Sequence, residues 1–506
     1  DVQIVATPKN SKGKPEFRTY RNSRDAYLIA ASSLSAETDA SGWKAELRIP
    51  LDGLPGLRND KRAVAFALNQ VDNQGKTLAK AFWGGREPLS YGFLVFGNPD
   101  QEELASLFAE RRRLIASLKA SERDPMKNTY RGGPRIYEVK SLTGHPRRFE
   151  RLELAVRLDA EYRNPFNFEE MNLFAEFVAP SGKKVRIDGF LYRKYELILF
   201  GRDAETIGSP GNPEWRLRFA PTETGTWRWR VQLKDRNGRS TETAWKRLTV
   251  ESSKNPGFLR VSRRDPRYLA FDSGRSFYGL GFASHFWNTR NVVLYTKHYL
   301  NQLAAFGGNY TSINLEVVGN GGFGLQVGKP LGVYSLENAF RLDYILECAE
   351  RRGIYLIACL HQTKIAMLSH WKNSIYSTEN GGPCAAPEEF FSSQEMRRIV
   401  KNRLRYLIAR WGYSTNLLGF EIFNEVNYTD GFRKNPTSVV DFHREIGSYL
   451  RTIDPNRHLI STCFGSSEAC ELPEIWHLPE IDFTITHSYA NDIAGELCNR
   501  QRNQAR

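Results

Sequence analysis

The sequence predicts a multidomain protein in which two β-sandwich domains are followed by an α/β domain of the (β/α)8 TIM-barrel type. Residues 1–98 and 135–252 contain short runs in which apolar and polar residues alternate, the period of a half-buried strand. From Phe258 onwards strand-like runs alternate with helical patterns, which predicts a parallel sheet with helical crossovers. We therefore place domains at 1–98, 135–252 and 253–506, with a helical linker at 99–134.

The composition is that of a globular protein with a basic balance. Of the 506 residues 41% are hydrophobic and 12% aromatic, and the net charge is +14. Such a charge favours acidic partners, nucleic acid or anionic polysaccharide among them, but Lys and Arg here are interspersed with Asp and Glu. The one dense basic run, at 111–113, lies on a predicted helix beside Glu110. We expect no nucleic-acid partner, and the lack of an apolar stretch of about 18 residues predicts no membrane span.

The cysteine spacing predicts no metal site. None of the six cysteines has CxxC spacing, and no other pattern indicates an organic cofactor. Cys348 and Cys359 lie in apolar contexts that are typical of buried thiols. Cys463 and Cys470 flank a short loop and could form a disulfide in an oxidising compartment, although spacing alone does not establish the geometry.

Two motifs in the first domain carry a resemblance to a known family. Residues 42–51 place Trp43 and Glu46 ahead of an Ile-Pro strand end, and residues 91–97 close the domain with Tyr-Gly-Phe-Leu-Val-Phe-Gly. These motifs resemble family 9 carbohydrate-binding modules, which are β-sandwiches. The resemblance covers only the later part of such a module. We therefore expect a chain that starts inside this domain, as an excerpt of a longer protein.

A helix predicted over 99–121, ended by Pro125, connects the first sandwich to the second. Within the second, the string at 215–227 resembles the immunoglobulin-like sandwich, of the DUF5060 type, that precedes the barrel in many cellulase-like hydrolases. The resemblance implies a domain that braces the barrel, so we interpret Trp215 and Trp227 as core residues rather than as platforms for sugar. Asn237 and Gly238 are expected to form a hairpin turn.

The last domain contains six predicted strands in the order of a barrel. They cover residues 277–282, 309–315, 354–361, 417–424, 458–464 and 481–487, and the helices among them are expected at 295–306, 335–352, 388–411 and 439–452. No Gly-rich phosphate turn follows the first strand, so a barrel is favoured over a doubly wound sheet. A complete barrel has eight strands. We expect a barrel that is truncated after about six.

Polar residues stand at the ends of several predicted strands, where barrel enzymes place their reactive groups. Asn424 and Glu425 end the fourth strand, His361 ends the third, and His487 and Tyr489 end the sixth. Residues 419–425 closely resemble the fourth-strand signature of the cellulase-like clan of retaining glycoside hydrolases (clan A, family 5-like). His361 matches that clan's third-strand histidine, and His487 with Tyr489 matches its sixth-strand His-x-Tyr.

The resemblance implies that Glu425 is the general acid/base of glycoside cleavage. Emerging from an apolar strand, its carboxyl is expected to be partly buried and to hold a proton near neutral pH. Asn424 is expected to bind a sugar hydroxyl beside the reacting carbon. His487 and Tyr489 could hold the carboxylates, and His361 could bind a sugar hydroxyl. The alternatives are a core role for His361, packing for Tyr489 and a surface carboxylate for Glu425.

Two departures from the clan's pattern affect the expected site. Ser312 stands where the clan often has an arginine on strand two, and Asn314 or Glu316 could cover part of that role. The clan's nucleophile lies at the end of strand seven, so we expect it beyond Arg506. The late acids, at positions 492 and 496, lie on a predicted helix and are not assigned.

Substrate contacts are expected from aromatic side chains in loops on the catalytic side, from an amide on strand two and from an amide just past Glu425. The candidates are Trp287, Asn314, Trp371, Tyr376 and Asn427. Plain loop packing is the alternative for the three aromatic residues. No spacing indicates an oligomeric state.

The function implied is hydrolysis of O-glycosidic bonds in a polysaccharide or oligosaccharide by a retaining double displacement. One alternative is a carbohydrate-binding protein with a degenerate or incomplete barrel that performs no cleavage. Another is a binder of anionic polymers driven by the net charge of +14. The basic balance favours an acidic glycan, with a neutral β-glucan left open, as is endo against exo action. The resemblance and the size of such a substrate imply an extracellular or periplasmic location.

Overall fold

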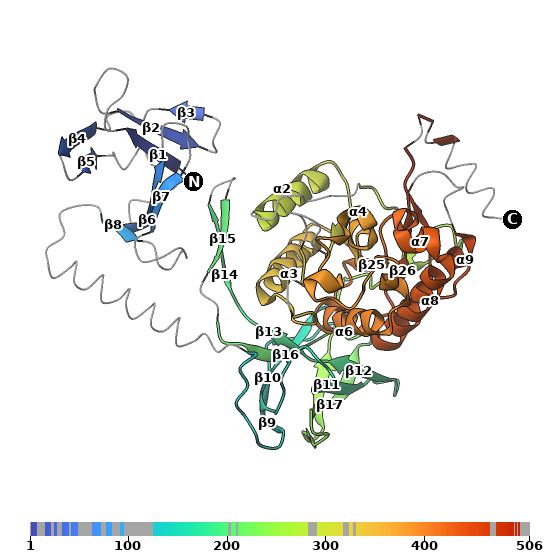
Figure 1. Cartoon of the computed structure of the whole chain (residues 1–506). Helices are drawn as coiled ribbons and strands as arrows, with labels where there is room; N and C mark the ends of the chain where they lie inside the picture. The colour runs from blue at the N-terminus through green and yellow to red at the C-terminus, as the bar shows by residue number, and fades with distance from the viewer. Residues whose placement is uncertain are drawn as a thin grey trace. The chain divides into compact units, whose positions relative to one another are not determined.

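The computed structural model divides the chain into two compact units (Figure 1). The first unit comprises residues 1–122 and 195–210, and the second comprises residues 123–194 and 211–506. The described residues are those of strands β1–β8 together with residues 125–200, 204–208, 211–281, 291–316, 323–326, 330–465, 472–489, 491–492 and 494–495. The predicted linker helix at 99–121 lies outside the described residues.

The strands of the first unit pair in antiparallel fashion. Its sheets and hairpins are β1 (Val2–Thr7), β2 (Glu16–Arg21) and β3 (Asp25–Tyr27); β4 (Ser33–Asp39) and β5 (Gly42–Arg48); β7 (Thr77–Phe82), β6 (Ala63–Val71) and β8 (Gly92–Val95); and β14 (Glu196–Phe200) with β15 (Ala204–Gly208). Strands thus occur where the alternating runs predict them. The carbohydrate-binding nature of this region stays a prediction.

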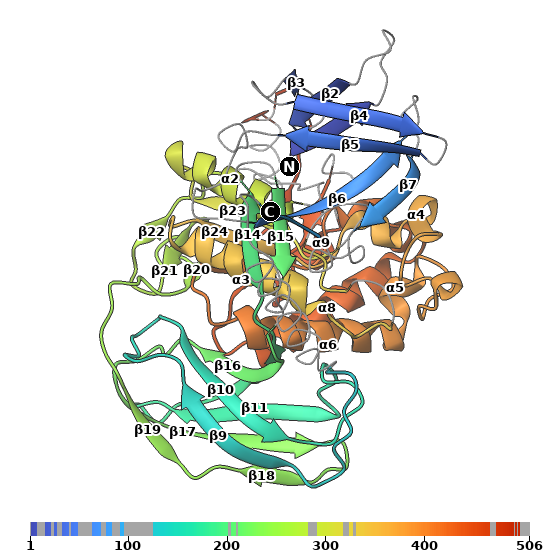
Figure 2. The same cartoon turned by 90° about the vertical axis from the view of Figure 1, so that its left-hand side faces the viewer.

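The second unit begins with two antiparallel sheets, in the orders β13-β16-β10-β9 and β12-β11-β17-β18, with β19 paired to β17. Their strands are β9 (Arg135–Ser141), β10 (Leu152–Asp159), β11 (Met171–Val178), β12 (Lys184–Asp188), β13 (Phe190–Tyr192), β16 (Glu214–Phe219), β17 (Gly225–Asp235), β18 (Ser240–Glu242) and β19 (Lys246–Val250) (Figures 1 and 2). Every second residue of β11 is buried, as period-two patterning requires.

The core of this sandwich is aromatic. The ring of Phe219 stacks on Phe177 with centroids 4.6 Å apart and meets the edge of Trp227 at 5.3 Å. Trp227 is fully buried and Trp215 is 7% exposed, so both are core residues, as interpreted from the sequence. Gly238 takes a positive φ of 76° in the turn between β17 and β18, where a side chain would be strained. The predicted hairpin turn is therefore present.

Parallel strands follow in the order that the sequence predicts. β23 (Tyr310–Asn314), β24 (Tyr355–Cys359), β25 (Leu417–Glu421) and β26 (Leu459–Ser461) form one parallel sheet, and β27 (Cys463–Phe464) pairs in parallel with β28 (Ile485–Thr486). These are the predicted second to sixth strands. Closure into an eight-stranded barrel, and its truncation, stay predictions.

The predicted first strand, 277–282, is split. Phe277 belongs to a small antiparallel sheet of β20 (Leu259–Val261), β21 (Leu269–Phe271) and β22 (Ser276–Phe277), whereas Gly281 forms a parallel bridge with Tyr310. The small sheet packs its side chains among those at the starts of the parallel strands, in a cluster of Leu259, Phe271, Phe277, Ile357, Leu418 and Leu459. This cluster is the apolar floor beneath the strand ends that carry the polar residues.

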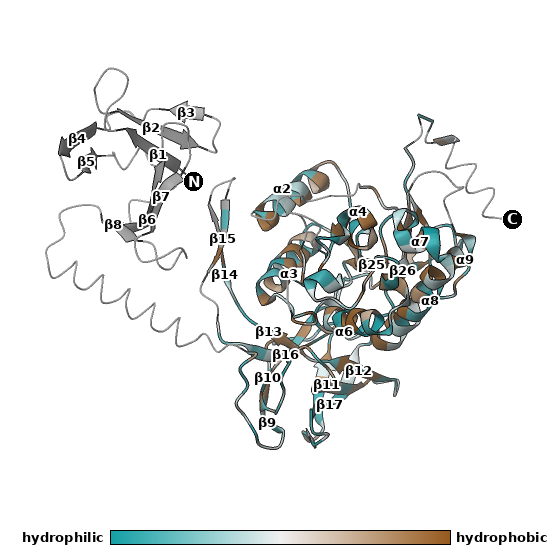
Figure 3. Ribbon diagram, in the orientation of Figure 1, coloured by the Kyte–Doolittle hydropathy of each residue, from teal (hydrophilic) through white to brown (hydrophobic). Residues whose placement is uncertain are grey.

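Helices connect the parallel strands and cover their outer faces (Figure 3). They are α2 (Val292–Ala305), α3 (Leu336–Glu350), α4 (Leu368–Trp371), α5 (Glu389–Ser392), α6 (Gln394–Trp411), α7 (Asp430–Lys434), α8 (Pro436–Ile453) and α9 (Pro473–Trp476), with 3-10 turns η3 (Thr363–Ala366), η4 (Thr378–Asn380) and η5 (Val426–Tyr428). Leu342 of α3 and Leu407 of α6 border, with Leu356 and Leu417, a small internal hollow of about 20 Å³ against the sheet. None of the described helices is long and apolar enough to cross a membrane.

The helix predicted over 388–411 is two helices. Ser393 separates α5 from α6, with extended backbone at φ −66° and ψ 123°, and its hydroxyl accepts a hydrogen bond from the Met396 amide. Ser393 is the N-cap residue of α6, because its hydroxyl satisfies an amide of the first turn. The cap requires extended backbone at Ser393, and this conformation interrupts the helix. By contrast Ser335 caps α3 as predicted, and Gly353 takes a positive φ of 64° after its end.

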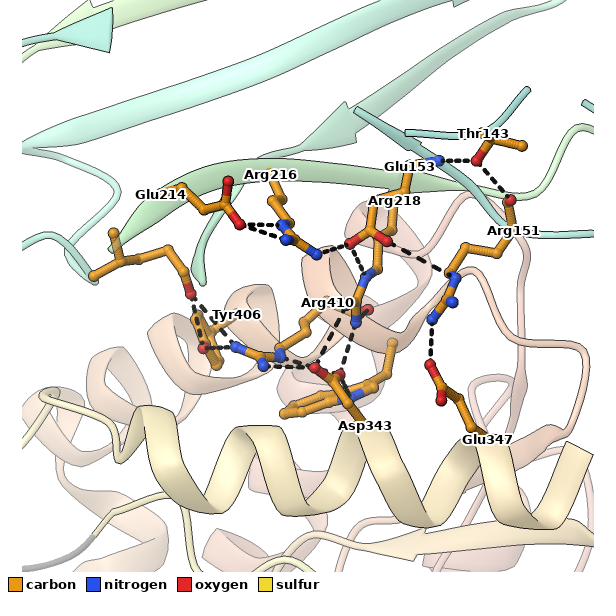
Figure 4. Close-up of polar contacts among 12 residues, drawn as sticks. Thr143, Arg151, Glu153, Glu214, Arg216, Arg218, Asp343, Glu347, Tyr406 and Arg410 are labelled. Atoms are coloured by element: carbon orange, nitrogen blue, oxygen red, sulfur yellow. Dashed lines mark hydrogen bonds and ion pairs between the residues drawn. The ribbon is translucent and has the colours of Figure 1, made fainter. Parts of the chain in front are cut away.

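The sandwich and the parallel-sheet domain share a buried ionic cluster (Figure 4). Arg218 of β16 lies between Glu153 of β10 and Asp343 of α3, with N–O distances of 2.8 and 2.7 Å. Arg410 of α6 also donates to Asp343, at 2.6 Å. Each of these side chains is at most 9% exposed. The cluster fixes α3 and α6 of the parallel-sheet domain against the sandwich.

Candidate active site

The Glu425 carboxylate stands just beyond the buried strand β25. Its backbone is left-handed, at φ 45° and ψ 52°, a region that costs a non-glycine residue on the order of 1 kcal/mol. Neighbouring backbone bonds hold this conformation: the Asn424 amide donates to the His361 carbonyl at 2.9 Å, and the Thr363 hydroxyl donates to the Asn424 carbonyl at 2.5 Å. The strained turn directs the Glu425 side chain over the end of the sheet.

Two donors converge on one oxygen of this carboxylate. His487 Nδ1 and the Tyr489 hydroxyl both lie 2.7 Å from Glu425 Oε1. The bond to Glu425 raises the pKa of His487, against the effect of burial, and also raises the pKa of the Tyr489 hydroxyl. The Glu425 side chain is 20% exposed, so solvent or a ligand reaches it. The structure thus brings together three of the residues selected from the sequence.

Cys463 completes the surroundings of His487. Its Sγ lies 3.3 Å from His487 Nε2, and β27 carries it into place by pairing with β28. The Nδ1 of His487 faces the Glu425 carboxylate, which can only accept, so Nδ1 carries a proton and donates it to Oε1. Cys470 lies outside the described residues, and its disulfide with Cys463 stays a prediction.

Asn427 does not line the site as expected. Both ends of its amide bind the backbone of Gly465: Nδ2 donates to the carbonyl at 2.9 Å, and Oδ1 accepts from the amide at 2.8 Å. The residue is 5% exposed. Because Oδ1 and one Nδ2 hydrogen are used in this way and the side chain is buried, Asn427 fixes the segment after β27.

Gly465 in turn touches the Glu425 carboxylate. A Cβ atom at this position would lie 2.9 Å from Glu425 Oε1 and 2.7 Å from the ring of Tyr428. A real Cβ atom does not approach other atoms so closely. The absence of a side chain therefore gives the carboxylate its position.

Replacing Gly465 with Ala is expected to lower turnover by about 10- to 100-fold, because displacing a reacting group by about 1 Å can cost 100-fold. The measurement is kcat for the glycoside hydrolysis that the sequence predicts, with thermal unfolding to verify the fold. Gly144→Ala is the matched control, since a Cβ there meets nothing within 4 Å. Wild-type turnover by Gly465→Ala would show that the carboxylate position is not critical.

His361 has a core position, contrary to the expectation that it binds sugar. It is fully buried, Nδ1 lies 2.8 Å from the Ile422 carbonyl, and Nε2 lies 2.7 Å from the Arg403 guanidinium. Burial and Arg403 lower its pKa well below the ordinary value. Because Arg403 can only donate, Nε2 carries no proton and Nδ1–H donates to the carbonyl. No ring nitrogen is left for a ligand.

Trp371 and Tyr376 are also corrected from substrate platforms to packing residues. Trp371 is 6% exposed and its indole donates to the Ala385 carbonyl at 3.2 Å. Tyr376 is 1% exposed and its hydroxyl donates to Glu316, which also accepts from Arg403 at 2.8 Å. Both residues belong to the segment between β24 and α6, and their side chains are buried there. Trp287 lies outside the described residues.

Asn314 lies at the end of β23, half-buried, and its Oδ1 accepts from Gln362 Nε2 at 2.5 Å. This leaves its amide hydrogens for a ligand, and its role stays a prediction. Glu316, the other residue proposed for this strand end, is 4% exposed and is bound by Arg403 and Tyr376. It therefore supports His361 from behind rather than facing a substrate.

Sequence reasoning missed Arg403, Glu421, Cys463 and Gly465. Glu421 carried a signal, since it is the one charged residue in the apolar run 417–423. Arg403 had none, because its role depends on α6 lying behind β24. Among the described residues no group of three His, Cys, Asp or Glu side chains could hold a metal ion.

Two hollows of about 410 and 540 Å³ lie elsewhere, between the sandwich and helices α6 and α8, and share Asn172, Arg405 and Tyr449. Their linings are basic, but Arg405 pairs with Asp188 at 2.8 Å and Lys401 with Glu445 at 2.6 Å. Part of the positive charge is thus used in joining the two domains.

Comparison with known proteins gives first a domain family and a shared fold. The family described as a domain of unknown function, DUF5060, matches residues 145–234, inside the sandwich for which that type was expected. A crystal structure from Bacteroides vulgatus, provisionally described as a glycoside hydrolase, shares the fold: its TM-score is 0.51 at 16% identity, over 72% of this chain and 64% of that one. At this identity the similarity shows a shared fold.

The curated relatives are more particular. Mannan endo-1,4-beta-mannosidase F of Aspergillus fumigatus is 22% identical over 172 residues, 30% of this chain and 36% of the relative. An Arabidopsis thaliana protein provisionally described as a mannan endo-1,4-beta-mannosidase is 23% identical over 235 residues, 42% of this chain and 53% of the relative. The chain thus spans about a third to a half of the length of these relatives.

Proposed function

We propose that the protein hydrolyses O-glycosidic bonds in a polysaccharide by a retaining double displacement, with Glu425 as general acid/base. The observation that carries the proposal is the Glu425 carboxylate held at a strand end by His487 and Tyr489, each 2.7 Å from Oε1. Fixed donors and partial exposure suit a group that must exchange a proton with a substrate oxygen. Similarity to mannanases favours a β-1,4-linked mannan as the substrate.

In the first step Glu425 protonates the leaving glycosidic oxygen while a second carboxylate attacks the anomeric carbon. A covalent glycosyl-enzyme forms and the cleaved chain leaves. In the second step Glu425 removes a proton from water, which displaces the carboxylate. The second carboxylate is expected from a strand that follows β28 in chain order. We expect Asn424 to bind the hydroxyl beside the reacting carbon, where a hydrogen bond strengthens in the transition state.

The residues around Glu425 serve its two protonation states. As a carboxylate it accepts from His487 and Tyr489, and as an acid it releases its proton toward the exposed side. The ring of His487 keeps Nδ1–H aimed at Oε1 when Glu425 is ionised. Because a polymeric substrate does not enter cells, we propose that the protein acts extracellularly.

The test is to express the protein with its complete reading frame and to measure release of reducing ends from β-1,4-mannan, a neutral β-glucan and a polyuronate. Proton NMR of the first products should show the β-anomer, because two displacements retain configuration. Initial formation of the α-anomer would contradict the double displacement. Binding without release of reducing ends would support a carbohydrate-binding protein instead, a function favoured by Ser312 in place of the expected arginine.

A further inference from the structure

Glu421 is a buried carboxyl group directly beneath the Glu425 site. It is the last residue of β25 and is 4% exposed. Asn424 Nδ2 donates a hydrogen bond to Glu421 Oε1 at 3.1 Å. The side chain of Asn424 is thereby tied to a group that itself does not face the solvent. Nothing in the mechanism above uses Glu421.

The groups that face Glu421 do not include an arginine or lysine among the described residues. Electrostatic interactions link it to Tyr310 of β23, Cys359 of β24, His487 beyond β28 and Glu425. Cys463 of β27 interacts with both Tyr310 and Cys359 in the same interior. Burial raises the pKa of Glu421 to about 7, and Glu425 adds to the rise, whereas Asn424 and His487 oppose it.

A protonated carboxyl suits this environment better than a charged one. Burying an unpaired carboxylate costs several kcal/mol, whereas a neutral acid requires only hydrogen bonds. Its carbonyl oxygen can accept from Asn424, and its hydroxyl adds no charge beside Glu425. An ionised Glu421 would place a second negative charge next to the carboxylate that must donate a proton, which would raise the pKa of Glu425 and hold His487 as imidazolium.

We propose that Glu421 is a positioning residue that, in its neutral protonated form, orients the Asn424 amide toward the substrate, and that its ionisation disturbs the site. This inference rests on the proposed hydrolase function. The bond to Glu421 uses one Nδ2 hydrogen and fixes the rotation of the amide, so that the other hydrogen is presented in one direction. Glu421 touches no reacting atom.

Three variants separate this role from a purely structural one. Glu421→Gln keeps the shape, accepts at one atom and donates at the other, and cannot ionise. Glu421→Leu replaces the carboxyl group by an apolar side chain of similar size and so removes the acceptor for Asn424. Glu474→Gln is the matched control. Glu474 is exposed, and its substitution removes one negative charge away from the site.

The first readout does not require activity. A group whose pKa is raised on folding contributes stability that is complete below its unfolded pKa and is lost as the pH rises through its folded pKa. The wild-type protein should therefore lose a few degrees of melting temperature relative to Glu421→Gln between about pH 4.5 and about pH 7, with no such difference for Glu474→Gln. If the melting temperatures of wild type and Glu421→Gln changed in parallel with pH, the proposal that Glu421 is neutral in the folded protein would be overturned.

The second readout is kcat and KM against pH on the polysaccharide that the wild type cleaves. Glu421→Gln should keep kcat within about threefold and stay active to higher pH, whereas Glu421→Leu should lose about 10- to 100-fold in kcat, because the Asn424 contact strengthens in the transition state. If Gln and Leu were equally damaging, the charge would be required and the proposal would fail.

If the wild type cleaves nothing, the proposed function fails but Glu421 can still be tested. Affinity for a manno-oligosaccharide, measured by calorimetry, should then fall at least about tenfold in Glu421→Leu and stay unchanged in Glu421→Gln, since the Asn424 amide is misdirected only in the first. Equal affinities for both variants would overturn the positioning role.

Discussion

Glu425→Gln is expected to reduce kcat on the polysaccharide by at least about a thousandfold, because glutamine keeps the shape of the side chain but supplies no proton. Reducing-end release at substrate saturation measures the effect. Glu474→Gln is the control for loss of one carboxylate on the same domain, at an exposed position. Unchanged melting behaviour would show that the loss is chemical and not structural.

Substrates with different leaving groups can show whether Glu425 acts as a general acid or in another role. An aryl glycoside whose phenolate leaves unaided needs no proton in the first displacement, so Glu425→Gln should form the glycosyl-enzyme at nearly the wild-type rate and then stall. A burst of released phenol followed by slow turnover is the expected trace. Equal loss on the aryl glycoside and on the polysaccharide would instead indicate that Glu425 positions the substrate, and turnover of the polysaccharide by the variant would remove Glu425 from the mechanism.

The sequence could indicate the site because chain order and strand ends coincide in parallel sheets. Glu425, His487 and Tyr489 each follow a strand, and the carboxyl ends of parallel strands meet at one edge. Their meeting at Oε1 of Glu425 therefore follows from topology. The left-handed backbone of Glu425 could not be foreseen, since the turn is set by bonds to His361 and Thr363.

The errors concern residues whose partners come from distant elements. His361, Tyr376 and Glu316 share Arg403, which α6 brings behind β24 from 42 residues away from His361. A side chain at a strand end can point outward to a ligand or inward to such a partner, and strand periodicity does not decide between them. The same holds for Trp371, whose indole finds a backbone carbonyl in a loop.

Part of the arginine content serves buried ion pairs inside the second unit. Arg218, Arg410 and Arg403 are buried and paired with carboxylates, and Arg405 joins α6 to β12 through Asp188. A net charge of +14 therefore does not by itself define a binding surface for acidic polymers. Planar guanidinium groups can bridge several acceptors at once, which suits a junction between a sandwich and helices.

Within that junction the Asp343 carboxylate binds two buried arginines and an indole. Its Oδ1 accepts from Arg218 at 2.7 Å and from the Trp411 indole at 2.8 Å, and its Oδ2 accepts from Arg410 at 2.6 Å (Figure 4). Burial alone would raise the pKa of this carboxyl, but Arg218 and Arg410 hold it well below its usual range. Glu153 is the second carboxylate of the cluster and binds Arg218 from the sandwich side.

Asp343→Ala is therefore expected to destabilise the protein by about 3–5 kcal/mol, because it leaves the buried Arg410 without its carboxylate partner and Arg218 with Glu153 alone. Urea unfolding of the second unit is the measurement. The control is Asp441→Ala, which breaks an ion pair with Arg444 whose side chains are 52% and 49% exposed and should cost at most about 1 kcal/mol. Since the cluster joins sandwich and helices, the variant should also unfold in two separated transitions where the wild type unfolds in one. A single transition with the wild-type midpoint would mean that apolar packing alone joins the two domains.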